Sequence, residues 1–299
     1  MLPLRQIRRR IRSTENTKKM TRAMEMVAAA KLKKLQELLK QSDLYIGELR
    51  RILETLVREK PLAHPLLEKR QESKATLAFL ITSDTGLCGS YNTNILDLAG
   101  QFLTPHLYPS PAAAEGGKEV GVHFIAIGRQ GAAFLKRAKQ TLSREFVIPR
   151  PQEIDQAIRE IAETAKNEFR NGQADRVLFL YTKAESLGSL KPTVAQLFPI
   201  ISQETEMREE KLVDYLIEPN LDQILEIMLP EFIEAEVGQL IKHSLVAEQA
   251  SRMMAMRQAT ENAKEMIDSL TLLRNKARQA SITKELIEVV SGARALQVK

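Results

Sequence analysis

The stretch ITSDTGLCGSYN, residues 81–92, contains the residues of this chain that most resemble a catalytic motif. It holds D-T-G at Asp84–Gly86, the tripeptide of aspartic proteases, and the single cysteine, Cys88. An aspartic protease needs two carboxyl groups that share a proton, and D-T-G occurs here once. A cysteine nucleophile needs a base, and the four histidines are scattered. The pattern therefore favours a turn between a strand and a helix that starts near Asn92.

Other chemical motifs are incomplete. The chain contains neither G-x-G-x-x-G nor G-x-x-x-x-G-K-[ST], so a nucleotide site is not predicted at this turn. One cysteine excludes an internal disulfide and any zinc site built on several cysteines. The S-x-x-K match at Ser281–Lys284 lacks the companion motifs of penicillin-recognising enzymes. We therefore expect no catalytic residues, no cofactor and no metal in this chain.

Charge is concentrated at the N-terminal end. Residues 1–40 hold 12 Lys/Arg and 3 Asp/Glu, a net charge of +9 within a total of +6. This end should meet an acidic partner: nucleic acid, anionic lipid or acidic protein loops. No aromatic residue accompanies the charge, which argues against stacking on single-stranded nucleic acid but leaves phosphate contacts open. One alternative is therefore a coiled-coil adaptor with a basic nucleic-acid-binding arm.

Both ends of the chain are almost free of helix breakers. No proline lies between Leu4 and Lys60 or after Pro230. Apolar residues at steps of three and four predict a coiled-coil seam in each end. In the first they are Leu32, Leu35, Leu39, Ile46, Leu49, Leu53 and Leu56, with Ser42 in the gap and added cover from Ile7, Ile11, Met20, Met24 and Val27. In the second they are Met253, Met256, Thr260, Ala263, Ile267, Leu270 and Ala277, interrupted by Arg274.

We expect these ends to form a rod, an antiparallel coiled coil of two long helices, with Pro230 in the first turn of the second helix. The middle alternates strands and helices, which predicts a Rossmann-like, mostly parallel sheet. The domains are expected at residues 1–60, 61–220 and 221–299. The expected strands are 76–82, 122–128, 144–149, 176–182 and 212–219, the expected helices are 92–103, 129–139 and 151–170, and residues 104–119 read as a surface loop.

Long motifs in this arrangement resemble the γ subunit of F-type ATP synthases. RRRIRSTENTKKMTRAMEMVAAAKL (residues 8–32) resembles the opening of that family, and NKARQASITKELIEVVSGARAL (residues 275–296) resembles its closing signature. TSDTGLCGSYN resembles its central motif, usually S-D-R-G-L-C-G-G, although Thr85 and Ser90 replace an arginine and a glycine. The resemblance covers the whole chain.

The resemblance implies a central rotor shaft without a catalytic site of its own. Such a shaft couples proton flow through the membrane sector to ATP synthesis or hydrolysis at the α/β head, and it regulates ATPase activity. The implied partners are three α and three β subunits, the ε subunit and the c-subunit ring, with δ in the same complex and no nucleic acid. Ion selectivity, H⁺ or Na⁺, belongs to the ring.

The resemblance also implies contact residues. Met24 and Arg252 match contacts near acidic β loops, and Arg278, Gln279 and Thr283 match contacts higher on the shaft. The family commonly has a tyrosine where this chain has Arg274.

The chain has no run that approaches the roughly 18 apolar residues of a membrane-spanning helix. It lacks the inserted cysteine pair of chloroplast relatives, and its Arg-rich start continues directly into the helical pattern. The resemblance therefore implies a bacterial complex, with this chain peripheral on the cytoplasmic side of the plasma membrane.

Overall fold

The computed structural model describes residues 4–59, 64–67, 75–103, 121–148, 153–186, 188–200 and 220–297. The chain divides into two compact units. The terminal unit comprises Met1–Ala30 and Arg252–Lys299, and the body unit comprises Lys31–Ser251. Each unit is described separately. The expected strand at 212–219 and the loop at 104–119 lie outside the described residues, and the division into residues 1–60, 61–220 and 221–299 stays a prediction.

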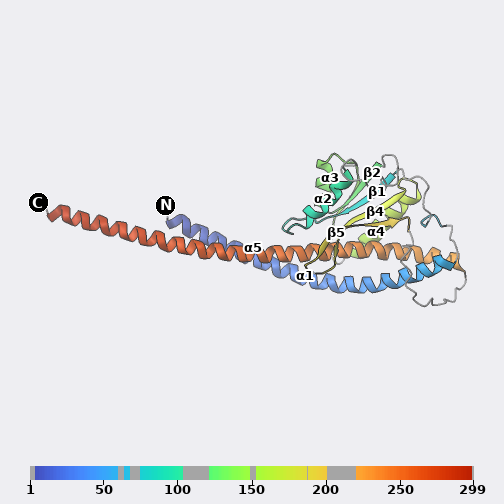
Figure 1. The fold of residues 1–299 in the computed structure, drawn as a ribbon, viewed down its shortest axis with the longest axis horizontal. Helices are drawn as coiled ribbons and strands as arrows, with labels where there is room; N and C mark the ends of the chain where they lie inside the picture. The colour runs from blue at the N-terminus through green and yellow to red at the C-terminus, as the bar shows by residue number, and fades with distance from the viewer. Residues whose placement is uncertain are drawn as a thin grey trace. The chain divides into compact units, whose positions relative to one another are not determined.

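Two long helices contribute to both units. They are α1 (Leu4–Glu59) and α5 (Leu221–Gln297). The body unit also contains α2 (Tyr91–Leu103), α3 (Arg129–Arg137), α4 (Ile154–Arg170) and the strands β1 (Ala75–Ile81), β2 (Gly121–Ile127), β3 (Leu142–Phe146), β4 (Arg176–Ala184) and β5 (Leu190–Phe198). Figure 1 shows these elements along the chain.

The predicted α1 seam is confirmed in the body unit. Its buried members recur at steps of three, four or seven: Leu32, Leu35, Leu39, Ser42, Ile46, Leu53 and Leu56. Ile46, Leu53 and Leu56 form one apolar cluster with Leu225, Leu229 and Phe232 of α5. Contacts between α1 and α5 run in opposite directions along the two helices, from Ser42–Lys242 to Arg50–Glu236. The coiled coil is therefore antiparallel here, as expected.

The expected position of Pro230 is wrong. The residue lies inside α5, nine residues after its start at Leu221, rather than in a first turn. The lost backbone bond leaves the Glu226 carbonyl without its usual donor, and Glu226 is exposed, so water can satisfy that oxygen. The neighbouring Leu229 and Phe232 are buried, and their packing stabilises the helical conformation on both sides of the proline.

In the terminal unit the same heptad register continues with smaller and more polar residues. Ile7, Ile11 and Ala28 of α1 are buried, as are Met256, Thr260 and Ala263 of α5. Thr21 and Thr260 share a buried hydrogen bond of 2.8 Å. The expected apolar cover from Met20, Met24 and Val27 is wrong, because these side chains are 55%, 37% and 56% exposed. They lie outside the register that Ile7, Ile11, Thr21 and Ala28 define.

The sheet of the body unit has the order β3-β2-β1-β4-β5. The first four strands are parallel, which confirms the Rossmann-like expectation. Helices α2 and α3 cover one face around Leu80, Ile95 and Leu135. On α4, Phe169 stacks on Phe198 of β5, while within the sheet Phe79 stacks on Phe179.

The antiparallel edge strand β5 was not predicted from the sequence. It pairs with β4 from Ala184↔Leu190 to Val177↔Phe198. Its residues LKPTVAQLF are partly polar and include Pro192, which only an edge strand tolerates. The expected third strand is also shifted, because β3 starts two residues earlier, at Leu142.

Gly47 offers a simple test of the α1 assignment. It lies in the interior of α1, it is exposed, and a Cβ added there meets no heavy atom within 4 Å. Gly47→Ala should therefore raise the free energy of unfolding by about 0.5–1 kcal/mol, because alanine loses less conformational freedom in a helix. Urea unfolding of both proteins measures this. Gly238→Ala is the contrast and should gain less, since its Cβ would lie 3.2 Å from the Ile158 side chain. No gain for Gly47→Ala would contradict the α1 assignment.

Candidate functional site

The turn between β1 and α2, residues 82–90, is called the central turn here and has a structural role. Its residues cap the N-terminus of α3: the backbone N–H groups of Arg129, Gln130 and Gly131 donate to Asp84 Oδ1 (3.0 Å), the Ser83 carbonyl (3.1 Å) and Thr82 Oγ1 (2.8 Å). The first backbone N–H groups of a helix have no acceptor within the helix, and the helix dipole favours a negative charge beside them, so a carboxylate stabilises this position. Asp84 is thus engaged with a helix end, and the turn between β1 and α2 positions α3.

Cys88 is also held by its surroundings. The side chain is 2% exposed and packs with Tyr91 and Ala247. Asn92 Nδ2 donates to Cys88 Sγ at 3.2 Å, and Ser251 Oγ donates to the Cys88 carbonyl at 2.6 Å. The thiol of Cys88 is thus buried and accepts a hydrogen bond from an amide, and α5 covers the backbone of this residue. Cys88 therefore has a packing role. The turn interpretation is therefore supported over a cysteine nucleophile.

The expected contact residues occupy two places in the terminal unit. Met24 is 37% exposed and Arg252 is half-buried, with interactions to its neighbours. Arg278, Gln279 and Thr283 are exposed on α5. Arg252 and Arg278 are 26 positions apart in the sequence, which corresponds to about 39 Å of helix.

Thr283 is engaged within its own helix. Its hydroxyl donates to the Gln279 carbonyl at 2.9 Å. The guanidinium of Arg278 and the amide of Gln279 project from the same stretch, where both residues are exposed. This stretch can therefore offer a cation and an amide to a partner, while the Thr283 hydroxyl already has an acceptor.

Sequence reasoning missed an apolar surface beside these residues. Every residue with a described side chain from Arg278 to Ala293 is exposed. Among them are large apolar side chains, 49–69% exposed: Ile282, Leu286, Ile287, Val289 and Val290. Isolated apolar residues at a surface are ordinary, but five within nine residues form a patch that water solvates poorly. The available signal was the apolar density of the segment ELIEVV.

The α1 segment of the terminal unit carries the positive charge. Arg5, Arg8, Arg9, Arg10 and Arg12 are all exposed, as are Lys19 and Arg22. Arg22 pairs with Glu25 of its own helix at 3.0 Å. The basic surface is thus solvent-facing and suits an acidic partner.

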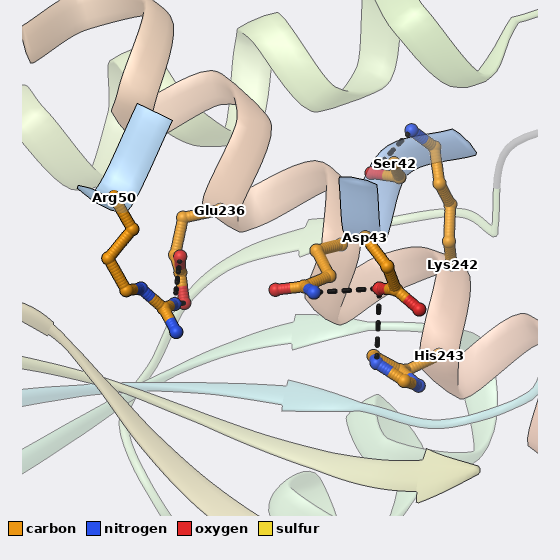
Figure 2. A network of polar contacts seen from close by, with 7 residues as sticks. Ser42, Asp43, Arg50, Glu236, Lys242 and His243 are labelled. Carbon is orange, nitrogen blue, oxygen red and sulfur yellow. Dashed lines mark hydrogen bonds and ion pairs between the residues drawn. The ribbon is translucent and has the colours of Figure 1, made fainter. Parts of the chain in front are cut away.

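The body unit contains a polar cluster where α1 meets α5. Figure 2 shows Arg50 facing Glu236, and Asp43 facing His243. Arg50 Nη2 lies 2.7 and 3.0 Å from the two Glu236 carboxylate oxygens. Gln239 donates to Asp43 at 2.7 Å, and Lys242 donates to Ser42 Oγ at 3.2 Å. These contacts tie the two helices together over little more than two turns.

His243 is nearly enclosed in this cluster. It is 8% exposed, its Nε2 lies 3.8 Å from Asp43 Oδ1, and its Nδ1 is buried with no hydrogen-bond partner among the described residues. Burial lowers the pKa of His243, nearby Asp43 opposes that change, and Lys183 adds to it. The neutral imidazole is therefore favoured in the folded protein.

This predicts a pH dependence of stability. As the pH falls below 6.5, the ordinary pKa of histidine, the unfolded chain takes up a proton before folded His243 does. The free energy of unfolding should therefore decrease as the pH falls from 6.5 through the lowered pKa. Urea unfolding at about pH 7.5 and about pH 5.5 measures this. His243→Gln should lose less stability over that interval, and parallel losses in both proteins would contradict the prediction.

Among the described residues, no group of three or more His, Cys, Asp or Glu side chains is arranged to hold a metal ion. None of the described helices has an apolar stretch long enough to cross a bilayer.

Comparisons with known proteins agree across the chain. The profile of a family described as ATP synthase matches residues 3–296. The chain is 38% identical to the ATP synthase gamma chain of Chlorobium chlorochromatii over 298 residues, covering 99% of each. It is 38% identical to that of Dehalococcoides mccartyi over 301 residues, covering 99% of this chain and 100% of the relative.

Solved structures share the fold. A chain of the mitochondrial ATP synthase of Euglena gracilis in rotational state 3 matches with a TM-score of 0.64 at 18% identity, covering 98% of this chain and 94% of that one. A chain from the central stalk and c-ring of the Tetrahymena thermophila mitochondrial ATP synthase matches with a TM-score of 0.56 at 22% identity, covering 80% and 99%. With the profile and the relatives at 38% identity, these matches lead to one conclusion: the chain belongs to the γ chain family of ATP synthases.

Proposed function

We propose that this chain is the central rotor shaft of an ion-translocating ATP synthase. In this role its terminal unit contacts the α and β subunits, and its body unit contacts the ε subunit and the ring of c subunits. Chemistry takes place on the partner subunits, and this chain transmits rotation. Family membership over residues 3–296 is the observation that carries the proposal.

The surface of the terminal unit supports this role. Its exposed basic residues suit acidic loops of a protein partner, and its exposed apolar patch at Ile282–Val290 requires an apolar one. We propose that Met24 and Arg252 contact the lower part of the head and that Arg278, Gln279 and Thr283 contact the upper part. In this proposal the complex lies at the bacterial plasma membrane, with this chain peripheral on the cytoplasmic side.

Reconstitution tests the proposal. The chain is expressed with the α and β subunits of its own organism, and co-elution and ATP hydrolysis are recorded. We expect one large species whose ATPase activity requires this chain. Failure to co-elute, with α and β shown to be competent by another γ chain, would reject the shaft role. Salt-sensitive binding to duplex DNA in that case would favour the adaptor alternative.

A further inference from the structure

In the body unit, α1 and α5 contact each other through polar side chains as well as through their apolar seam. We call this set the register cluster: Ser42, Asp43 and Arg50 on α1, and Glu236, Gln239 and Lys242 on α5. Glu236 and Gln239 continue the seam of α5, because they follow Leu229 and Phe232 at steps of three and four. Polar groups therefore occupy the two positions that the preceding heptad fills with leucine and phenylalanine.

An apolar heptad seam does not define its own axial position well. Leu32, Leu39, Ile46 and Leu53 recur every seven residues, so a slip of seven residues presents an almost equivalent surface. Such a slip moves one helix by about 10 Å along the other. A few polar residues at seam positions can remove this ambiguity, because each needs a specific partner.

We propose that the register cluster fixes the axial position of α1 against α5. In the observed register Asp43 meets Gln239 and Arg50 meets Glu236. A slip of seven residues in one direction places Asp43 opposite Phe232 and Arg50 opposite Leu229. A slip in the other direction places Asp43 opposite Val246 and Arg50 opposite His243, so only the first of these two contacts is with an apolar side chain. The apolar residues Phe232, Leu229 and Val246 are at most 5% exposed. Both slips thus separate Asp43 and Arg50 from their polar partners on α5 and place at least one of them beside a buried apolar side chain, which is unfavourable.

The cluster connects α1 to a helix that is itself fixed on the sheet. Ser244 Oγ of α5 accepts from the Thr182 N–H of β4 at 3.2 Å, and Gly238 lets the Ile158 side chain of α4 approach closely. Since α5 is held at these points, the register cluster also sets the height of α1 relative to the sheet. Under the proposed function, which this step assumes, such a lock resists axial sliding of the two helices when the shaft is loaded.

Spin labels measure the register directly in the full chain. Leu44 of α1 and Ile227 of α5 are 68% and 72% exposed, so cysteines at both positions can carry nitroxides. A Cys88→Ser background removes the native thiol. The parent protein should give a single distance by pulsed electron resonance. A fourfold variant with Asp43→Ala, Arg50→Ala, Glu236→Ala and Gln239→Ala should give a second distance peak displaced by about 10 Å.

Two variants control for general weakening of the helix pair. Arg51→Ala removes a neighbouring cation whose partner, Glu48 at 2.8 Å, lies on α1 itself, and it should keep the single distance. The swap Arg50→Glu with Glu236→Arg should also keep it, whereas Arg50→Glu alone should not. The fourfold variant keeping one unshifted distance would overturn the proposal. If that variant does not fold by circular dichroism, the comparison of Arg50→Glu with the swap decides, and equal distributions in those two would overturn it.

A functional measurement separates this inference from the proposed function. In the reconstituted complex, ions transported per ATP hydrolysed should fall for the fourfold variant and stay unchanged for Arg51→Ala. If the parent chain itself supports no transport, the shaft role fails while the distance result still stands. If the parent chain supports transport and the fourfold variant shows a normal ratio with a shifted distance, the register has no mechanical role.

Discussion

Replacing Ile282, Leu286 and Val290 together by glutamine should weaken assembly with the α and β subunits by roughly 30-fold, about 2 kcal/mol, and leave the isolated chain as stable as before. These residues lie one turn apart on α5 and are 49%, 60% and 55% exposed. Each of these residues therefore keeps about half of its surface or more in contact with water in the isolated chain. If it is buried on assembly, as the shaft role requires, the loss of apolar contact appears in binding and not in folding.

The measurement is the concentration of this chain that restores half of the maximal ATPase activity to α and β subunits. A matched control is Lys284→Gln with Glu288→Gln, which removes an exposed ion pair in the same turns of α5 (78% and 65% exposed). It should change the concentration at half-maximal activity little, because exposed ion pairs contribute little. Unchanged assembly of the triple variant would mean that the patch is not an interface. A lower melting temperature of the isolated variant would mean that the side chains pack within the chain.

Much of the fold was predictable because its signals are local. The seven-residue repeat from Leu32 to Leu56 identifies α1 as a coiled-coil helix, and the continuous apolar run of β1 identifies a strand buried in a parallel sheet. The wrong expectations arose where packing overrides a local rule. Pro230 normally starts a helix, yet buried Leu229 and Phe232 on either side hold α5 together through it. Pro192 normally argues against a strand, yet it lies in β5 at the sheet edge.

The candidate site was less accessible to sequence reasoning. Motif resemblance suggested Met24, Arg252, Arg278, Gln279 and Thr283, and their contacts with partner subunits stay a prediction. The register cluster joins residues separated by 186–200 positions, so no local pattern signals it. The cover expected from Met20, Met24 and Val27 followed their apolar character alone, because the seam near the N-terminus contains Thr21 and Ala28, which are not strongly apolar.

Among the glycine-to-alanine substitutions described, Gly128→Ala should lower the free energy of unfolding the most, by at least about 3 kcal/mol. Gly128 has φ of +105°, which side-chain-bearing residues rarely adopt. A Cβ there would lie 2.2 Å from the Thr82 carbonyl oxygen. This clash can be relieved only if the end of β2 moves away from the end of β1. The same movement breaks the hydrogen bonds that cap α3. For a domain with total stability of about 5–15 kcal/mol, this approaches unfolding.

Thermal unfolding followed by circular dichroism measures the loss, with Gly100→Ala as the control. A Cβ at Gly100 in α2 meets nothing within 4 Å, so that variant should melt at or above the parent temperature. Adding Thr82→Ala to Gly128→Ala should not restore stability, because the closest contact is with the Thr82 backbone and not with its hydroxyl. Rescue by that second change would show that the side chain, rather than the strand backbone, limits the space. The same contacts join the end of β2 to the central turn and to the start of α3. The Gly128→Ala substitution should therefore also displace Asp84 from the N-terminus of α3.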